Sequence, residues 1–446
     1  MDRTDRARAN RPIDREIRRL ALPALGALVA EPLFLLTDSA LVGHLGVVPL
    51  AGLGIASVVL QTIIGLMVFL AYATTPAVAR RLGAGDECGG VSVGIDGMWL
   101  ALGLGAVLAG AGAILSPALV SLFGPDPAVA DQATTYLSIS MLGLPAMLIV
   151  FAATGLLRGL QDTRTPLIVA VAGFGANAAL NAVLIYGAGW GIAGSAAGTV
   201  LAQWGMVAAY VVVVLRHARR TGATVRPERE GIRGSALSGG WLLVRTASLR
   251  AALVLATVVA TGIGTAELAG FHVVLTVFST MAFALDALAI AAQALVGKGI
   301  GAADVSFVRA VLRRCLVWGV GGGAVLGVVL ASLSDVAGLL FTGSAETAAL
   351  IAPSLVILAV GTPLAGYVFV LDGVLIGAGD ARYLALTGLV NLAVFVPLAS
   401  AAAAWGGSGA TGLAWLTAAF AIGYIAARAT TLGLRSRGTA WQRTGL

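Results

Sequence analysis

Twelve apolar stretches, each about 20 residues long, run through this chain and leave few folds open to it. Only 11% of the 446 residues are charged, whereas soluble domains carry about a quarter, so lipid must cover most of the surface. A stretch of this length is typical of a transmembrane helix. We therefore expect an all-α integral membrane protein with twelve transmembrane helices. The stretches lie near 20–43, 50–74, 91–115, 134–157, 166–187, 191–215, 240–263, 267–293, 311–331, 350–375, 383–405 and 409–432.

The two halves of the chain repeat one another. Residues 50–86 align without a gap with residues 268–304, at an offset of 218 residues (268 against 50), and Pro145 and Pro363 keep the same offset. This offset predicts two equivalent six-helix lobes, an arrangement typical of transporters whose pathway lies between paired halves. Because proline kinks a membrane helix, we expect both lobes to bend at these two positions.

The repeat and the polar stretches also predict the domain boundaries. The longest polar stretch is charged, rich in glycine and lies where the repeat expects the join between halves, so we interpret it as a linker. The predicted parts are a cytoplasmic N-terminal tail at 1–19, an N-lobe at 20–215, the linker at 216–239, a C-lobe at 240–432 and a cytoplasmic C-terminal tail at 433–446.

Basic residues follow every second apolar stretch, and the other connections contain no lysine or arginine. Cytoplasmic loops of membrane proteins carry such an excess of positive charge. We therefore expect a multi-pass protein of the cell membrane with both termini in the cytoplasm and no cleaved signal peptide. The net charge of +7 resides largely in these loops, so we expect it to contact anionic lipid rather than nucleic acid.

Two acidic residues, Glu31 and Asp38, lie in the first apolar stretch. They are seven residues apart and so share one helix face, about 10 Å apart along the axis. Burial disfavours the charged form of a carboxyl group, so such an acid can exchange a proton near neutral pH. We interpret both as candidates for coupling transport to an ion, although either would also serve to hydrogen-bond helices inside a bundle.

Neutral polar residues in two later stretches are candidates for the same site. Asn177 and Asn181 are four residues apart on one helix face, and Thr199 lies in the next stretch. Amides and hydroxyls bond to a carboxyl group in either protonation state, so these residues are suited to a polar pocket with Asp38. The alternative is that the amides only hold helices together.

The second half lacks this polar set. Its residues at the equivalent positions are Leu249, Ala256, Phe395 and Ala399. Common scaffolding would tend to recur in both halves, so this asymmetry predicts that ion coupling belongs to the N-lobe.

The second half has acids of its own within apolar stretches, Asp286 and Asp372. Together with Tyr367 they are candidates for a substrate cleft, where the acids would attract a cationic molecule. The alternative is that the acids bond internally within the lobe.

No motif in the sequence indicates an enzyme, a metal site or a cofactor. The three histidines do not pair with cysteine or acidic residues at metal-ligand spacing, and no phosphate-binding loop of the Walker type is present. We therefore expect no ATP hydrolysis by this chain.

Four motifs resemble a known transporter family. They are TDSALVGHLG in the first stretch, LLRGLQDTRTPL after the fourth, FALDALAIAAQALVGKGIGAAD across the eighth and LDGVLIGAGD across the tenth. In this order they resemble the multidrug and toxic compound extrusion (MATE) family, and within it the DinF-like branch. The resemblance implies a monomer of twelve helices in two pseudo-twofold lobes with a V-shaped central cleft, and export driven by inward H⁺ or Na⁺. It also implies a coupling site at Asp38 with Asn177, Asn181 and Thr199 as partners.

The sequence departs from the family pattern at two places. Many relatives have aspartate where Asn181 stands, and we expect Glu31 to compensate from the same helix face as Asp38. The Na⁺-coupled branch that resembles NorM uses an acid in its seventh helix, and none lies between Leu242 and Ile263. The missing acid in the seventh stretch is interpreted as favouring H⁺ over Na⁺ as the coupling ion.

We therefore predict a proton-coupled antiporter that exports amphipathic, often cationic drugs or toxic metabolites by alternating access. A Na⁺-coupled MATE exporter is one alternative, and an organic-acid exporter is another because plant relatives are linked to organic anions. A lipid-linked sugar flippase would need fixed positive charge in its cleft, and we expect no central lysine or arginine in the apolar stretches. A membrane receptor or scaffold that transports nothing would explain neither the repeat nor the acids inside the membrane.

Overall fold

The computed structural model describes residues 3–341 and 345–444, and every regular element in these residues is a helix. Eleven of the helical spans are long and apolar enough to cross a membrane. A bent pair, α5 (Pro127–Met141) and α6 (Leu144–Gly159), provides a twelfth when the two helices are taken as one span. The prediction of an all-α membrane protein with twelve helices is therefore confirmed.

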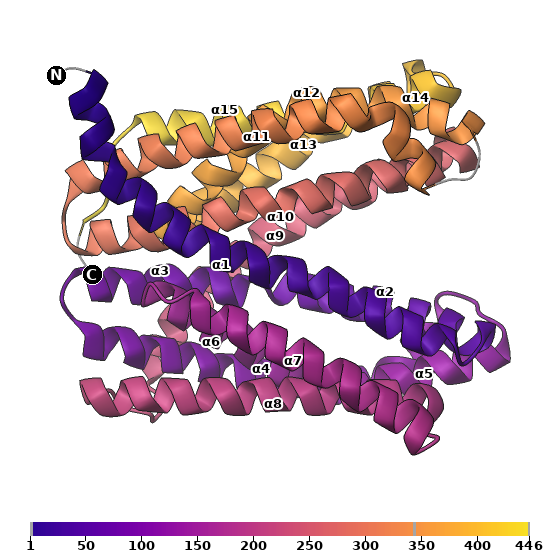
Figure 1. The fold of residues 1–446 in the computed structure, drawn as a ribbon, viewed down its shortest axis with the longest axis horizontal. Helices are drawn as coiled ribbons and strands as arrows, with labels where there is room; N and C mark the ends of the chain where they lie inside the picture. The colour runs from indigo at the N-terminus through magenta and orange to yellow at the C-terminus, as the bar shows by residue number, and fades with distance from the viewer. Residues whose placement is uncertain (1–2, 342–344, 445–446) are drawn as a thin grey trace. The chain divides into compact units, whose positions relative to one another are not determined.

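The chain forms two compact units, and the long helix α1 (Arg3–Gly43) contributes to both. The first unit contains residues 22–239, and its long helices lie side by side (Figure 1). Besides α1, α5 and α6, this unit contains α2 (Val47–Met67), α3 (Phe69–Gly83), α4 (Glu87–Ser121), α7 (Arg164–Ala182), the π-helical turn η1 (Val183–Gly187) and α8 (Gly191–Thr221). Within it α4 and α3 pack against α6, α2 packs against α5, and α7 packs against α8.

The second unit contains the chain from Gly240 onward together with α1 up to Ala21. Its helices are α9 (Arg229–Ile263), whose residues before Gly240 belong to the first unit, α10 (Thr265–Gly301), α11 (Val305–Phe341), α12 (Ala345–Gly377), α13 (Ala381–Trp405), α14 (Gly409–Ala418), η2 (Ala419–Tyr424) and α15 (Ile425–Arg437). The central helix is α12, which packs against α10, α11, α14 and α15. The predicted lobe and linker boundaries stay a prediction.

The two prolines expected to bend the lobes behave differently. The chain turns by 47° between α5 and α6, where Leu142 and Gly143 end one helix and Pro145 lies in the first turn of the next. Proline is suited to a first turn, because the missing N–H has no intrahelical partner there. In contrast, α12 runs without a break through Pro363. The repeat therefore does not produce the same helix break in both units.

Small residues bring helices of the second unit into close contact. Gly319, Gly323 and Gly327 lie four residues apart on α11 and face α12. A Cβ added at Gly323 would lie 2.6 Å from the carbonyl oxygen of Thr362. Small residues at this spacing let two membrane helices approach until their backbones touch.

The buried core of the first unit surrounds the polar site described next. Leu53, Leu137, Met141 and Ile185 belong to one apolar cluster, and the ring of Tyr136 is part of it. Close packing fixes the rotamers of such side chains, so the Tyr136 hydroxyl is held in one place.

Candidate functional site in the first unit

Asp38 is buried in α1, with only 4% of its surface exposed, and three helices supply its hydrogen bonds. Ser195 Oγ of α8 donates to Oδ1 at 2.6 Å, and Asn181 Nδ2 of α7 donates to the same oxygen at 2.8 Å. The Tyr136 hydroxyl of α5 donates to Oδ2 at 3.1 Å. A buried carboxylate is stable only when such donors replace its water. No basic side chain in the described part of the chain bonds to Asp38.

A second layer of polar groups extends this network. Asn181 Nδ2 also donates to Asn177 Oδ1 at 3.2 Å, and Asn177 Nδ2 donates to Thr199 Oγ1 at 2.9 Å. The four side chains from Thr199 to Asp38 therefore form one chain of hydrogen bonds. Within the described residues, Asn181 Oδ1 is buried and has no hydrogen-bond partner.

A cavity inside the first unit reaches from Asp38 to Glu31. Its volume is about 80 Å³, and one water molecule needs roughly 10–15 Å³ on this measure, so several waters fit. Phe34 and Phe174 stack in its wall with ring centroids 5.1 Å apart. Glu31 is half-buried in the same wall and has a polar interaction of its own. The other polar residues in the lining are Ser57, Gln61, Tyr136, Ser140, Asn177, Thr199 and Gln203.

The structure thus brings together four residues that sequence reasoning selected, namely Asp38, Asn177, Asn181 and Thr199. It places Glu31 at the cavity wall rather than among the partners of Asp38. Their role in ion coupling stays a prediction.

Sequence reasoning missed Tyr136 and Ser195. Ser195 had a usable signal, because it precedes Thr199 by four residues and so lies on the same helix face. A single tyrosine near the end of an apolar stretch gave no comparable signal, since the amphipathic ring is common at membrane interfaces.

The equivalent positions of the second unit are apolar in the structure as well. Ala256, Phe395 and Ala399 are fully buried there. Phe395 packs edge-on against Phe420, with ring centroids 6.2 Å apart. The two units therefore share a helical plan but differ in chemistry at this place.

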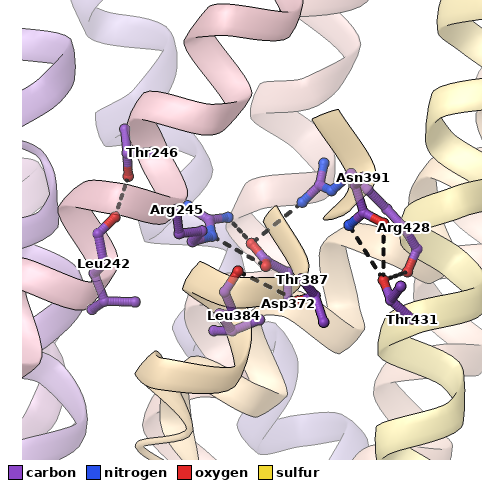
Figure 2. Close-up of polar contacts among 9 residues, drawn as sticks. All are labelled: Leu242, Arg245, Thr246, Asp372, Leu384, Thr387, Asn391, Arg428 and Thr431. Atoms are coloured by element: carbon purple, nitrogen blue, oxygen red, sulfur yellow. Dashed lines mark hydrogen bonds and ion pairs between the residues drawn. The ribbon is translucent and has the colours of Figure 1, made fainter. Parts of the chain in front are cut away.

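One of the two acids named as cleft candidates in the second unit bonds internally, as the alternative interpretation had it. Asp372 of α12 forms an ion pair with Arg245 of α9, and its Oδ2 lies 3.7 Å from Nη2 of Arg428 of α15 (Figure 2). All three residues are buried. The view that no span carries a central arginine is wrong, because Arg245 lies in the middle of α9 and Arg428 in the span Gly409–Arg437. Sequence reasoning did not select either arginine, and both lie within six residues of an end of the predicted stretches 240–263 and 409–432.

The other two cleft candidates are half-buried in the second unit. Asp286 lies on α10 and has a polar interaction of its own. Tyr367 lies on α12, and its hydroxyl is close to Gly433 of α15. Their role with a substrate stays a prediction.

Comparison with known proteins identifies the family. The MatE family model matches residues 23–183 and again residues 248–401, which is more than half of the chain. The chain belongs to the MATE family. The charge argument against a lipid-linked sugar flippase no longer holds, because Arg245 and Arg428 lie inside the second unit.

The relatives of this MATE protein include plant and bacterial proteins. Protein DETOXIFICATION 44, chloroplastic, of Arabidopsis thaliana is 32% identical over 387 residues, covering 84% of this chain and 74% of the relative. DNA damage-inducible protein F of Escherichia coli (strain K12) is 29% identical over 299 residues, covering 66% of this chain and 65% of the relative. These are relatives of the kind that the DinF-like motifs predicted.

Solved structures agree with the fold. The Vibrio cholerae MATE transporter VcmN in the bent form superimposes with a TM-score of 0.85 at 21% identity, over 97% of this chain and 99% of that one. A transporter of the MOP superfamily from Pyrococcus furiosus gives a TM-score of 0.84 at 22% identity, over 97% of each chain. The match to the MatE family model makes this protein a multi-pass membrane transporter of the multidrug efflux family, and such transporters bind small-molecule substrates.

Proposed function

We propose that this MATE transporter is a proton-coupled antiporter of the cell membrane and that Asp38 carries the proton. The observation that supports this is the surroundings of Asp38, a buried carboxyl group with three donors, no basic partner among the described residues and a cavity for water beside it. We further propose that both termini lie in the cytoplasm, because basic residues follow every second span. We also propose a monomer, as the family resemblance implies.

The hydrogen bonds suggest how protonation would move helices. The ionised carboxylate accepts from Asn181, Ser195 and Tyr136 at once. A neutral acid is a weaker acceptor, and its proton needs an acceptor, such as the hydroxyl oxygen of Ser195 or Tyr136. The Nδ2 group of Asn181 can only donate, so protonation weakens its bond to Asp38 and the link between α1 and α7. A proton would then favour one arrangement of the first unit over the other.

Small amphipathic molecules are the proposed cargo. The cationic preference expected from Asp286 and Asp372 loses part of its basis, because arginine neutralises Asp372. Export of organic acids is the second candidate, and the buried arginines of the second unit favour it. Coupling to Na⁺ is less consistent with a site in which one carboxylate already receives three donors.

Flux through liposomes tests the proposal. Purified protein would be reconstituted with an imposed pH gradient or with a Na⁺ gradient alone, and the export of ethidium and of carboxyfluorescein would be followed. We expect the pH gradient to drive flux in the wild type and not in Asp38→Asn, which should fall to the rate of empty liposomes. Flux driven only by Na⁺, or an unimpaired Asp38→Asn variant, would refute the coupling site.

A further inference from the structure

Two guanidinium groups and one carboxylate meet inside the second unit. Arg245 from α9 donates from Nε to Asp372 Oδ1 at 3.2 Å and also pairs with Oδ2, whereas Arg428 reaches the same carboxylate from α15 (Figure 2). The exposed fractions are 9% for Arg245, 7% for Asp372 and 8% for Arg428. Both arginines are charged at any physiological pH, so this cluster of three side chains carries a surplus positive charge.

The guanidinium of Arg428 has few hydrogen-bond acceptors around it. Its guanidinium has five N–H donors, but in the part of the chain that the structure describes its polar contact is the Asp372 oxygen 3.7 Å away. That distance is too long for a hydrogen bond. Buried polar groups are nearly always hydrogen-bonded, and a buried charge without close partners is costly.

A neighbouring hydroxyl group also lacks a hydrogen-bond partner among the described residues. Tyr424 is 2% exposed, and its hydroxyl has no hydrogen-bond partner within the described residues. Tyr424 ends η2 and precedes Arg428 of α15 by four residues in a continuous helical segment, so the two side chains lie on neighbouring turns of one helix face. Arg428 and Tyr424 therefore present unused donors in the same buried region, as expected of a site for negatively charged oxygens.

We propose that Arg428, Arg245 and Tyr424 bind the carboxylate of a small organic anion, and that Asp372 pairs with the arginines when this site is empty. The planar guanidinium fits the two oxygens of a carboxylate, as the contact with Asp372 illustrates. The inference rests on the proposed function in one respect, which is that the bound anion is the transported substrate. Binding of the anion itself does not require proton coupling. A phosphate group of an anionic lipid would share this chemistry, so the experiment separates the two sources.

Thermal unfolding of the purified full-length protein in detergent tests the site, with benzoate, succinate or inorganic phosphate added at constant ionic strength. We expect benzoate or succinate to raise the melting temperature of the wild type in a saturable way. Arg428→Gln should weaken the apparent affinity at least tenfold, and Tyr424→Phe, which keeps the ring, should weaken it severalfold. The matched control is Arg437→Gln, an exposed arginine nine residues along α15, which should behave like the wild type.

Two further variants test the role of Asp372 and the independence from coupling. Asp372→Asn removes the internal competitor, so we expect it to bind the carboxylate more tightly than the wild type. Asp38→Asn should keep full carboxylate binding even if it loses proton-driven flux. The carboxylate site and the proton-coupling site can therefore be refuted independently of each other.

Several results would overturn the inference. The first is a shift in melting temperature that is absent or does not saturate in the wild type. The second is an unchanged shift in Arg428→Gln, and the third is a shift with phosphate but not with carboxylates. The same thermal unfolding measurement in nanodiscs with and without phosphatidylglycerol tests whether the ligand is an anionic lipid. A stabilisation that depends on Arg428 and on this lipid, and that carboxylates do not reproduce, would also contradict a small-molecule ligand.

Discussion

Asp38 accepts its hydrogen bonds from two hydroxyls and one amide, so each donor affects the cost of its charge separately. The amide was predictable from the spacing of Asn177 and Asn181 and from the family resemblance. Of the two hydroxyls, Ser195 had a signal in its spacing of four residues from Thr199. Tyr136 had none, because tyrosine is common at membrane interfaces for other reasons. The buried arginines were missed for a different reason, since a charge near a predicted helix end looks solvated until the true length of the helix is known.

Removing one hydroxyl should change the pH dependence of transport. In Ser195→Ala the charged form of Asp38 loses its shortest hydrogen bond, so protonation becomes easier and the pH of half-maximal flux should move upward. We expect a flux several times lower at the original optimum, measured in liposomes over a series of pH values. Ser116→Ala is the matched control, because this buried serine bonds only the Gly112 carbonyl of its own helix. An unchanged pH profile in Ser195→Ala would show that the bond does not affect coupling.

Helix number and type followed from hydropathy, but the contacts between helices did not. Composition shows that glycine is abundant, yet only the structure shows which glycines face a neighbouring helix. The prolines illustrate the same limit, because Pro145 lies at a helix break and Pro363 lies inside a continuous helix. Local sequence sets the tendency to bend, and the surrounding packing decides the result.

The contact between α11 and α12 should be sensitive to added volume. Gly323→Leu would force a side chain against the backbone of Thr362 and Pro363, so we expect a loss of stability of about 1–3 kcal/mol. Gly321→Leu lies two residues away in open space and should have little effect. Thermal unfolding of both variants in detergent provides the comparison, and equal stability would contradict the packing described for this helix pair.

For the whole molecule, the repeat predicted two similar halves but not the path of α1 between them. The first turns of α1 belong to the second unit, where Arg314 donates to both oxygens of Asp14 at 2.8 and 2.6 Å. The repeat contains no signal for this, because a bond between residues 300 positions apart leaves no local pattern. The predicted N-terminal tail is therefore helical from Arg3 and partly joined to the second unit.

Cysteine labelling tests the orientation in the membrane. Cys88 is exposed at the start of α4, after the basic pair Arg80 and Arg81, and Cys315 is buried. A membrane-impermeant maleimide should therefore modify Cys88 in inside-out vesicles and not in intact cells with a sealed membrane. Cys88→Ser should abolish the labelling. Modification of Cys88 from the outside would reverse the proposed topology.

Infrared difference spectroscopy tests the central claim most directly, because it detects the proton on a carboxyl group. Spectra of the reconstituted protein would be recorded as the pH is lowered, for the wild type, Asp38→Asn and Glu31→Gln. We expect a carbonyl band of a protonated carboxyl group to appear in the wild type and in Glu31→Gln and to be missing in Asp38→Asn. A band that survives in Asp38→Asn and disappears in Glu31→Gln would show that Asp38 does not carry the proton.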